Sequence, residues 1–453
     1  MRFNKWINLE LFHSVFSQQP DSRQDNRQKS IETQQSIKLC VITQFFPPDY
    51  AATGQLLEEL VMNLGLLGIE IDVFTSQPGY AYQVKNAPQV EYRGRVRIQR
   101  SRTAQLAPGR IRGKAINGVL YTLRTAWHLF RARHWNNVLL ISTAPPFLPL
   151  LGYFANILFK TPYVCILYDL YPDIAVALGV VSKRHWLARF WESVNQKVWK
   201  RAMGIVVLSP AMKRQVVISC PAIADKVSVI HSWADPNWIL PIAKHENWFA
   251  WKYNLVKKFT VLYSGNLGRC HDMNTILETA KQLQNDPIQF LIIGAGAKLT
   301  ELVTEVNRLG LKNFLFLPYQ DKKVLPYSLT ACDLSLVSVD ERTENLVTPS
   351  KLYSALASER PIAAICSQFC YLRQIISEAN CGSSFDNGDS NGLTQFIRLL
   401  SQDSLLAERM GKAGRQYLRA NFTPKIIAKQ YLDVLKQAVI SPEIVSMTQT
   451  QSE

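Results

Sequence analysis

Short apolar runs alternate along the chain with longer stretches whose apolar residues recur at helical spacing, and this rhythm predicts strands joined by helices. The strands fall into two series separated by a linker. Strands that alternate with helices form parallel, doubly wound sheets, so the pattern predicts two Rossmann-like α/β domains. The first series is Ile37–Thr43, Glu70–Thr75, Asn137–Ser142, Tyr163–Tyr168, Gly204–Ser209 and Val227–Ile230; the second is Phe259–Ser264, Ile288–Gly294, Phe314–Leu317, Leu334–Val339 and Pro361–Ile365.

The length of 453 residues is enough for two domains that each bury a core. The first 36 residues are polar and rich in glutamine, which is typical of disorder. We expect ligands to bind where the C-terminal ends of the two sheets face each other. The expected organisation is a disordered extension at 1–36, an N-terminal domain at 37–235, a C-terminal domain at 236–425, a helix at 426–440 that returns to the N-terminal domain, and a disordered tail at 441–453.

The eight cysteines have no paired spacing, and several lie inside apolar runs, which is typical of reduced thiols in a cytosolic protein. Cys366, Cys370 and Cys381 are close in sequence, but no histidine lies near them, so we expect no metal site. The chain lacks the roughly 18 clean apolar residues of a membrane-spanning helix, and residues 1–36 lack the apolar core of a secretory signal. We therefore expect a cytoplasmic protein.

The net charge of +16 is concentrated in the first half of the chain. Eleven arginines and lysines and no acid occur between Tyr92 and Arg133, and an apolar helical stripe runs through the later part. A second basic segment, rich in tryptophan, spans 183–201. Either the stripes face their own core, or the surplus of arginine binds anionic lipid at the inner face of the plasma membrane. No nucleic-acid recognition motif accompanies the charge. The stripe is Ile116, Val119, Leu120, Leu123, Trp127 and Phe130.

The segment 346–357 reads as a helix start suited to an anion. Thr348 is a good N-cap residue, and Pro349 suits the first helical position. Ser350 and Lys351 then add a hydroxyl and a cation near the positive end of the helix dipole. An ordinary capped helix is the alternative.

A second feature of the same kind is the strand that ends in the turn Gly265-Asn266-Leu267-Gly268-Arg269. Glycines let backbone amides approach a ligand closely, and Arg269 can hold a phosphate through two nitrogens. Asp272 is expected to cap a helix from Met273 to about Leu283. Together the two features favour a phosphate-binding site, with Arg269 and Lys351 at its exposed edges.

These motifs give the chain a resemblance to glycosyltransferase family four (group 1), over about Ile37 to Leu435. Together they resemble a narrower branch that includes colanic acid and O-antigen glycosyltransferases of exopolysaccharide biosynthesis. The resemblance implies the GT-B fold, in which two Rossmann-like domains face each other, the first on the acceptor side and the second binding a nucleotide sugar. The motifs are Gln44–Gly54, Ser142–Pro146, Tyr168–Asp173 and Pro349–Tyr353.

The resemblance implies a retaining, hexosyltransferase-like and metal-independent transfer of sugar from a nucleotide diphosphate donor. The acceptor would be a polyprenyl-diphosphate-linked or other saccharide, and no cofactor besides the nucleotide-sugar substrate is expected. Fixed cations would stabilise the leaving diphosphate, and Asp169 would orient the acceptor hydroxyl. The expected catalytic residues are Asp169, Arg269 and Lys351, and the expected donor-binding residues are Thr53, Gly54, Gly265, Asn266, Gly268, Glu344, Thr348 and Ser350.

The chain also departs from the family pattern. The arginine and lysine that usually follow the first strand of the C-terminal domain are replaced here by Asn266 and His271. The second carboxylate of the family's Glu-x7-Glu pair is replaced by Ser354, with Glu344 near the place of the first. The usual N-domain histidine is matched by Tyr168. Two alternatives therefore stay open: a non-catalytic GT-B partner subunit and a GT-B sugar-nucleotide epimerase.

Overall fold

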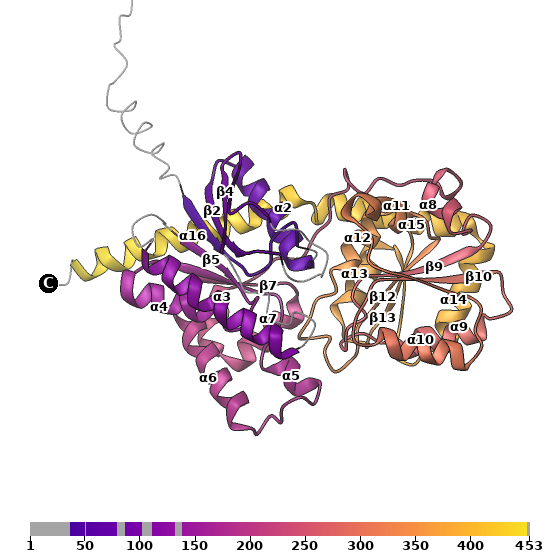
Figure 1. Cartoon of the computed structure of the whole chain (residues 1–453), viewed down its shortest axis with the longest axis horizontal. Helices are drawn as coiled ribbons and strands as arrows, with labels where there is room; N and C mark the ends of the chain where they lie inside the picture. The colour runs from indigo at the N-terminus through magenta and orange to yellow at the C-terminus, as the bar shows by residue number, and fades with distance from the viewer. Residues whose placement is uncertain (1–36, 50, 79–86, 102–110, 132–137, 451–453) are drawn as a thin grey trace, which may run out of the picture. The chain divides into compact units, whose positions relative to one another are not determined.

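The computed structural model describes residues 37–450 except 50, 79–86, 102–110 and 132–137. The predicted extension at 1–36 and three arginines of the basic segment, Arg102, Arg110 and Arg133, lie outside the described residues. The rest folds into two α/β domains, each with its own sheet, as the sequence predicts (Figure 1).

The first sheet has eight strands in the order β3-β4-β2-β1-β5-β6-β7-β8. All neighbouring strands pair in parallel except β3 and β4, which are antiparallel. The strands β1, β2 and β5 to β8 occur where the apolar runs predict them, and their central residues are buried on both faces, as expected of a sheet covered by helices. The bounds are β1 Lys38–Ile42, β2 Glu70–Ser76, β3 Val90–Arg93, β4 Val96–Ser101, β5 Val138–Ser142, β6 Tyr163–Leu167, β7 Gly204–Val207 and β8 Val227–Val229.

The second sheet has six parallel strands in the order β11-β10-β9-β12-β13-β14. The five predicted strands of this series are confirmed, and β14 adds an edge strand of polar sequence that the apolar pattern does not reveal. The bounds are β9 Phe259–Ser264, β10 Ile288–Ile293, β11 Phe314–Leu317, β12 Leu334–Ser338, β13 Ile362–Ile365 and β14 Gly382–Phe385.

Helices follow most strands and complete the two domains (Figure 1). They are α2 Ala52–Leu66, α3 Ile111–Arg131, α4 Pro149–Phe159, α5 Asp173–Ala177, α6 Trp186–Arg201 and α7 Pro210–Ser219 in the first half, and α8 Trp248–Lys252, α9 Asn274–Gln282, α10 Leu299–Arg308, α11 Leu325–Thr330, α12 Lys351–Ala357, α13 Tyr371–Ala379, α14 Ser390–Gln402, α15 Ser404–Asn421 and α16 Pro424–Thr450 in the second.

The last helix, α16, packs on α2 and on β5, β6 and β7 of the first sheet. Its buried residues, among them Ile427, Tyr431 and Leu435, belong to the core of the N-terminal domain. The helix is described as far as Thr450, so it includes most of the segment that the sequence predicts as a tail.

The arginine-rich stretch after Tyr92 contains the end of β3 and the whole of β4, two strands that the sequence pattern does not predict. Arg100 is buried and donates to the carbonyl oxygens of Pro47 and Pro88, at 2.8 and 3.0 Å, and to Glu91 at 2.9 Å. Arg93 and Arg97 form further ion pairs with acids. The stretch contains no acid, but its neighbours in space supply Glu58, Asp72 and Glu91, so these three arginines are not available for a lipid surface.

The helix α3 turns the predicted apolar stripe outward. Its buried side consists of Gly118, Tyr121, Thr125 and Leu129, and the Tyr121 hydroxyl lies 2.7 and 2.8 Å from two backbone carbonyl oxygens of the sheet. The alternative that the stripe faces its own core is therefore wrong for five of its six residues. The five exposed residues are Ile116 (48%), Val119 (48%), Leu123 (63%), Trp127 (62%) and Phe130 (52%).

The first turn of α2 packs against the backbone of the preceding loop, and this packing requires glycine. A Cβ on Gly54 would lie 2.9 Å from the carbonyl carbon and oxygen of Phe45. We expect Gly54→Ala to lower the free energy of unfolding by about 1–3 kcal/mol, because backbone atoms have no room to yield. Gly65→Ala is the control in the same helix, since its Cβ would meet only the Val96 side chain, at 3.3 Å. Chemical denaturation of both variants tests this; equal stabilities would contradict it.

Candidate functional site

Three loops at the C-terminal ends of strands meet in space. They are the loop 168–172 after β6, the turn 265–273 after β9 and the segment 339–350 after β12. The amide of Leu170 donates to the carbonyl oxygen of Leu346 at 3.3 Å, and the amide of Asp340 donates to that of Cys270 at 2.9 Å. Burial raises the pKa of Cys270, and the negative charge of Asp169 adds to this effect. Contacts thus join predicted site segments from both sheets.

The turn after β9 packs directly against the turn after β10 and is hydrogen-bonded to it. The amides of Gly265 and Leu267 donate to the carbonyl oxygens of Ile293 and Ala295, at 2.8 and 2.9 Å. Gly265 has a φ of +133°, and a Cβ on Gly294 would lie 2.0 Å from the Gly265 oxygen. The glycines therefore permit two backbone turns to lie in contact, which fixes the shape of the predicted phosphate loop.

The exposed side of this turn carries Asn266 and Arg269, and Gly268 lies half-buried between them. Arg269 lies at an exposed position, as predicted. Asp272 accepts from the amides of Asn274 and Thr275, at 2.9 and 3.1 Å, at the start of α9 as predicted, but the helix begins at Asn274 and Met273 is its N-cap residue.

The helix α12 begins at Lys351, two residues later than the sequence predicts. Thr348 is not its N-cap, because its hydroxyl lies 3.4 Å from the sulfur of Met212 and makes no cap hydrogen bond. The first helical bonds run instead from the amides of Leu352 and Tyr353 to the carbonyl oxygens of Pro349 and Ser350. Ser350 holds the N-cap position without a side-chain cap. A helix of seven residues that starts in this way gives little support to a dipole-based anion site.

The side chain of Lys351 reaches the turn after β9. Its Nζ lies 3.0 Å from the Tyr263 hydroxyl and 3.3 Å from Nε2 of His271. It also lies 4.7 Å from the centroid of the Tyr263 ring. Lys351 is half-buried rather than at an exposed edge, and burial lowers its pKa to about 7. The structure thus joins Lys351 to the Gly265 turn, as the predicted phosphate site requires.

Asp169 follows the buried strand β6 and borders a small hollow lined in part by Thr143, Pro146 and Asn195. The side chain remains accessible, but surrounding protein atoms partly desolvate the carboxylate and raise its pKa to about 6. Tyr168, which stands at the position of the family's histidine, is buried, and burial raises the pKa of its hydroxyl. Asp169 is therefore the accessible titratable group of this loop.

Glu344 is buried and tied to the loop after β13. It accepts from the Ser367 amide at 3.2 Å and from the Ser367 hydroxyl. Thr53 and Gly54 lie in the first turn of α2 rather than in a loop before it, since this helix begins at Ala52. The structure gives no contact of Thr53 or Gly54 with the other predicted residues among those it describes.

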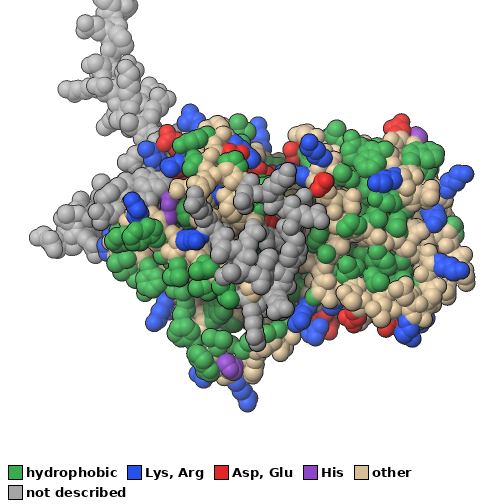
Figure 2. Space-filling view, viewed as in Figure 1, with side chains coloured by type: hydrophobic (Ala, Val, Ile, Leu, Met, Phe, Trp, Pro, Cys, Tyr) green, Lys and Arg blue, Asp and Glu red, His purple; other side chains and the backbone are tan. Residues whose placement is uncertain are grey.

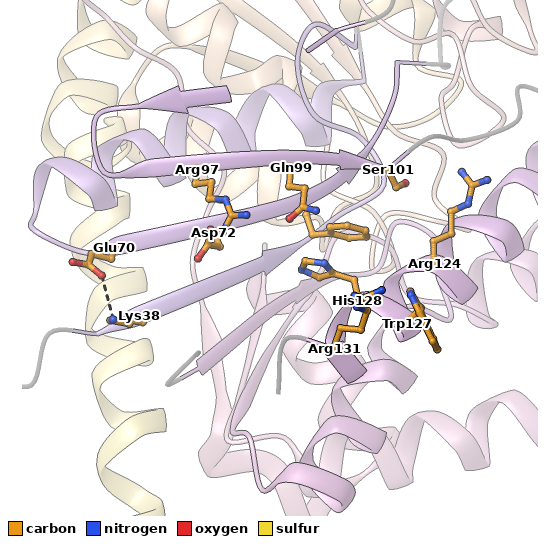
Figure 3. A pocket seen from close by; sticks show the side chains of 11 residues that line it. Lys38, Glu70, Asp72, Arg97, Gln99, Ser101, Arg124, Trp127, His128 and Arg131 are labelled. Carbon is orange, nitrogen blue, oxygen red and sulfur yellow. Dashed lines mark ion pairs between the residues drawn. The ribbon is translucent and has the colours of Figure 1, made fainter. Parts of the chain in front are cut away.

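A cavity in the N-terminal domain shares no lining residue with this site. It has a volume of about 770 Å³ and lies between α3 and the strands β1, β2 and β4 (Figure 3). Two ion pairs, Lys38–Glu70 at 3.7 Å and Arg97–Asp72 at 3.5 Å, line it. Among the described residues, no cluster of three histidine, cysteine or acidic side chains could hold a metal ion.

Family comparisons divide the chain as the two sheets do. Residues 52–233 match the family described as glycosyl transferase 4-like domain, and residues 246–417 match glycosyl transferases group 1. The curated protein WbjE of Pseudomonas aeruginosa, which bears the name of a glycosyltransferase, is 27% identical over 314 residues, covering 66% of this chain and 74% of WbjE. WcaI of Escherichia coli (strain K12), named as a colanic acid biosynthesis glycosyl transferase, is 35% identical over 100 residues, covering 22% of this chain and 25% of WcaI.

Solved structures share the two-domain architecture at low sequence identity. Sucrose-phosphate synthase from Thermosynechococcus elongatus is 17% identical with a TM-score of 0.71, covering 89% of this chain and all of that one. Anabaena HepE in complex with UDP-glucose is 14% identical with a TM-score of 0.66, covering 88% and 99%. With two parallel-sheet domains and matches to both family domains, this chain has the GT-B fold and belongs to the group 1 glycosyltransferases.

Proposed function

We propose that this chain is a retaining hexosyltransferase that moves a sugar from a nucleotide diphosphate donor to a polyprenyl-diphosphate-linked saccharide in cell-surface polysaccharide biosynthesis. The observation that carries the proposal is the Lys351 ammonium beside the Gly265 turn, joined by backbone contacts to the loop of Asp169. The name of WcaI, which refers to colanic acid biosynthesis, supports the pathway, and the UDP-glucose bound to HepE supports the donor class.

Negative charge grows on the diphosphate as the bond to the sugar breaks. Lys351 and Arg269 are the cations that we assign to this charge, with the backbone of the Gly265 turn close to it. A turn fixed by hydrogen bonds to β10 needs no reorganisation when the charge appears. These protein groups, rather than a metal ion, supply the positive charge in this proposal.

Asp169 is assigned to the acceptor. With a pKa of about 6 it is mainly ionised near neutral pH, so it can accept a hydrogen bond from the acceptor hydroxyl and orient its oxygen toward the sugar. In a retaining reaction on one face of the sugar, an oxygen of the leaving phosphate takes the hydroxyl proton. The new glycosidic bond forms as the bond to the diphosphate breaks.

The acceptor's lipid points to a membrane, and the N-terminal domain has a surface that fits one. The lipid-facing surface is formed by α3, α4 and α6, which contact one another in this order. Figure 2 shows hydrophobic side chains with lysines and arginines among them over this part of the molecule. No described helix has the length and hydropathy needed to span a bilayer. Besides the α3 stripe, the exposed apolar residues include Phe154, Leu158, Trp186 and Phe190, and the exposed cations include Arg124, Arg131, Lys160, Lys183, Arg184 and Arg189.

The first prediction tests the diphosphate site. We expect Lys351→Met and Arg269→Ala each to weaken nucleotide diphosphate binding about ten- to a hundredfold, because a hydrogen bond to a charged group contributes roughly 1.5–3 kcal/mol. Calorimetry with UDP and GDP measures the affinity, and nucleotide release in the presence of a lipid-linked acceptor measures turnover. Lys312→Met, an exposed lysine elsewhere in the same domain, is the control. Unchanged binding in both site variants would refute the assignment, and absence of turnover with every donor would favour a non-catalytic subunit.

The second prediction concerns Asp169. Its raised pKa means that the folded state binds more protons than the unfolded state between about pH 4 and pH 6, so this group's contribution to stability falls as the pH rises through that window. Asp169→Asn removes the cost of the partly desolvated charge. We expect the variant to melt at a higher temperature than the wild type at pH 7.5 and at the same temperature below pH 4, while its turnover falls. A variant that melts lower at pH 7.5 would indicate a structural carboxylate.

The third prediction tests the lipid-facing surface. Replacing Leu123 and Trp127 of α3 with serine should reduce binding to vesicles that contain anionic lipid, because both side chains are exposed and would insert into the interface. Binding of the wild type should rise with the anionic fraction and fall with salt, since exposed charges are screened within about 8 Å at physiological ionic strength. Leu405→Ser, at an equally exposed position on α15, serves as control. Co-sedimentation that is the same in all three proteins would exclude α3 as the docking helix.

A further inference from the structure

The ammonium of Lys351 is held by neutral groups alone among its described contacts. The Tyr263 hydroxyl donates its proton to the carbonyl oxygen of Asn266 at 3.0 Å, so its oxygen accepts from Lys351. The second contact, at 3.3 Å, is to Nε2 of His271. No carboxylate balances the charge, and desolvation therefore lowers the pKa of Lys351 to about 7.

His271 is locked in the tautomer that can accept from Lys351. Its Nδ1 lies 2.7 Å from the carbonyl oxygen of Ser338, and a carbonyl only accepts, so Nδ1 carries the hydrogen. The side chain is 8% exposed, and burial lowers its pKa to about 3, with the charge of Lys351 as a second cause. The ring is therefore neutral, and the lone pair on Nε2 faces the ammonium.

The ammonium of Lys351 lies close to the backbone of the Gly265 turn. A Cβ on Gly265 would lie 3.2 Å from Cε of Lys351, so only glycine gives the lysine this approach without a close contact. An ammonium has three hydrogens, and the two neutral acceptors use two of them. The third remains for a ligand at the turn.

We propose that His271 is a positioning residue that holds Lys351 beside the Gly265 turn as an uncompensated cation, so that the donor's diphosphate supplies the missing negative charge and its binding takes up a proton. This inference rests on the proposed function. It adds a role for His271 and a measurable coupling between diphosphate binding and proton uptake. It also gives a reason for the histidine at a place where the family resemblance implies a lysine: a second ammonium there would repel Lys351, whereas a neutral imidazole accepts from it.

The protonation state of Lys351 in the free protein determines whether diphosphate binding takes up or releases protons. At pH 8 the free Lys351 is mostly neutral, and a bound diphosphate raises its pKa, so binding should take up close to one proton. At pH 6 the lysine is already charged, and it should take up almost none. The other titratable groups of the cluster are Tyr263, Tyr319 and Lys298, whose ammonium donates to the carbonyl oxygen of His271 at 2.6 Å.

Calorimetry in buffers of different ionisation enthalpy measures this uptake, with whichever of UDP and GDP binds more tightly as probe. At pH 8 the phosphates of the probe are fully ionised, so protons taken up come to the protein. Lys351→Met should abolish the uptake at pH 8. A Lys351→Met variant that binds the probe with the same uptake as the wild type would overturn the linkage.

The positioning role is tested with a matched pair of substitutions. His271→Phe keeps a ring but removes the acceptor, and we expect it to weaken probe binding at pH 8 about tenfold and at pH 6 much less, because neutral lysine becomes more favoured. His271→Gln places an amide oxygen near the position of Nε2 and should stay within about threefold of the wild type. Melting temperatures establish that both variants are folded.

The outcomes separate the two proposals. A folded His271→Phe with wild-type affinity at both pH values, or a His271→Gln as weak as His271→Phe, would overturn the role of His271 and leave the diphosphate site intact. Failure of the wild type to bind either nucleotide at any pH would overturn the proposed function, and this inference with it.

Discussion

A half-buried ammonium group, with no carboxylate among its contacts in the described part of the chain, is the constraint on which the candidate site depends. Removing a cation from water is costly, and proteins usually offset the cost with an opposite charge. Here two neutral acceptors, Tyr263 and His271, offset part of it. They preserve the positive charge for a ligand, whereas a carboxylate in their place would neutralise it. The arrangement therefore favours an anion that comes and goes over a permanent internal partner.

Such a cation is useful only if the backbone around it is equally fixed. The turns after β9 and β10 provide this by lying in direct contact, with hydrogen bonds from Gly265 to Ile293 and from Leu267 to Ala295. The turn after β10 needs glycine, since a Cβ on Gly294 or Gly296 would overlap the backbone of the turn after β9. The predicted phosphate loop and the loop that supports it thus lie in direct contact, and the lysine side chain reaches them from a helix about 80 residues further along the chain.

The sequence predicts features that depend on neighbouring residues and misses those that depend on distant ones. The strand β9, its glycine turn and the Asp272 cap follow one another directly, so their pattern can be read locally. Thr348 and Pro349 match the local rule for a helix start, but the helix begins two residues later, at Lys351. The strand β4 was missed because its arginines look like a charged surface until their partners, such as Asp72, are known. Tyr263 gave no signal, since only the fold brings it to Lys351, whereas His271 was visible as a departure from the family pattern.

The helix α3 shows the same limit for amphipathic patterns. A stripe of apolar residues indicates that one face avoids water, but not which neighbour covers it. In α3 the side toward the sheet includes Gly118, Tyr121, Thr125 and Leu129, and the Tyr121 hydroxyl bonds two backbone carbonyl oxygens. Five apolar residues of the stripe lie on the exposed side. Their exposure costs roughly 25 cal/mol for each Å² of apolar surface left in water. An apolar stripe beside Arg124 and Arg131 fits an anionic lipid surface better than it fits water. In the function that we propose, α3 therefore supplies the contact between the N-terminal domain and a membrane.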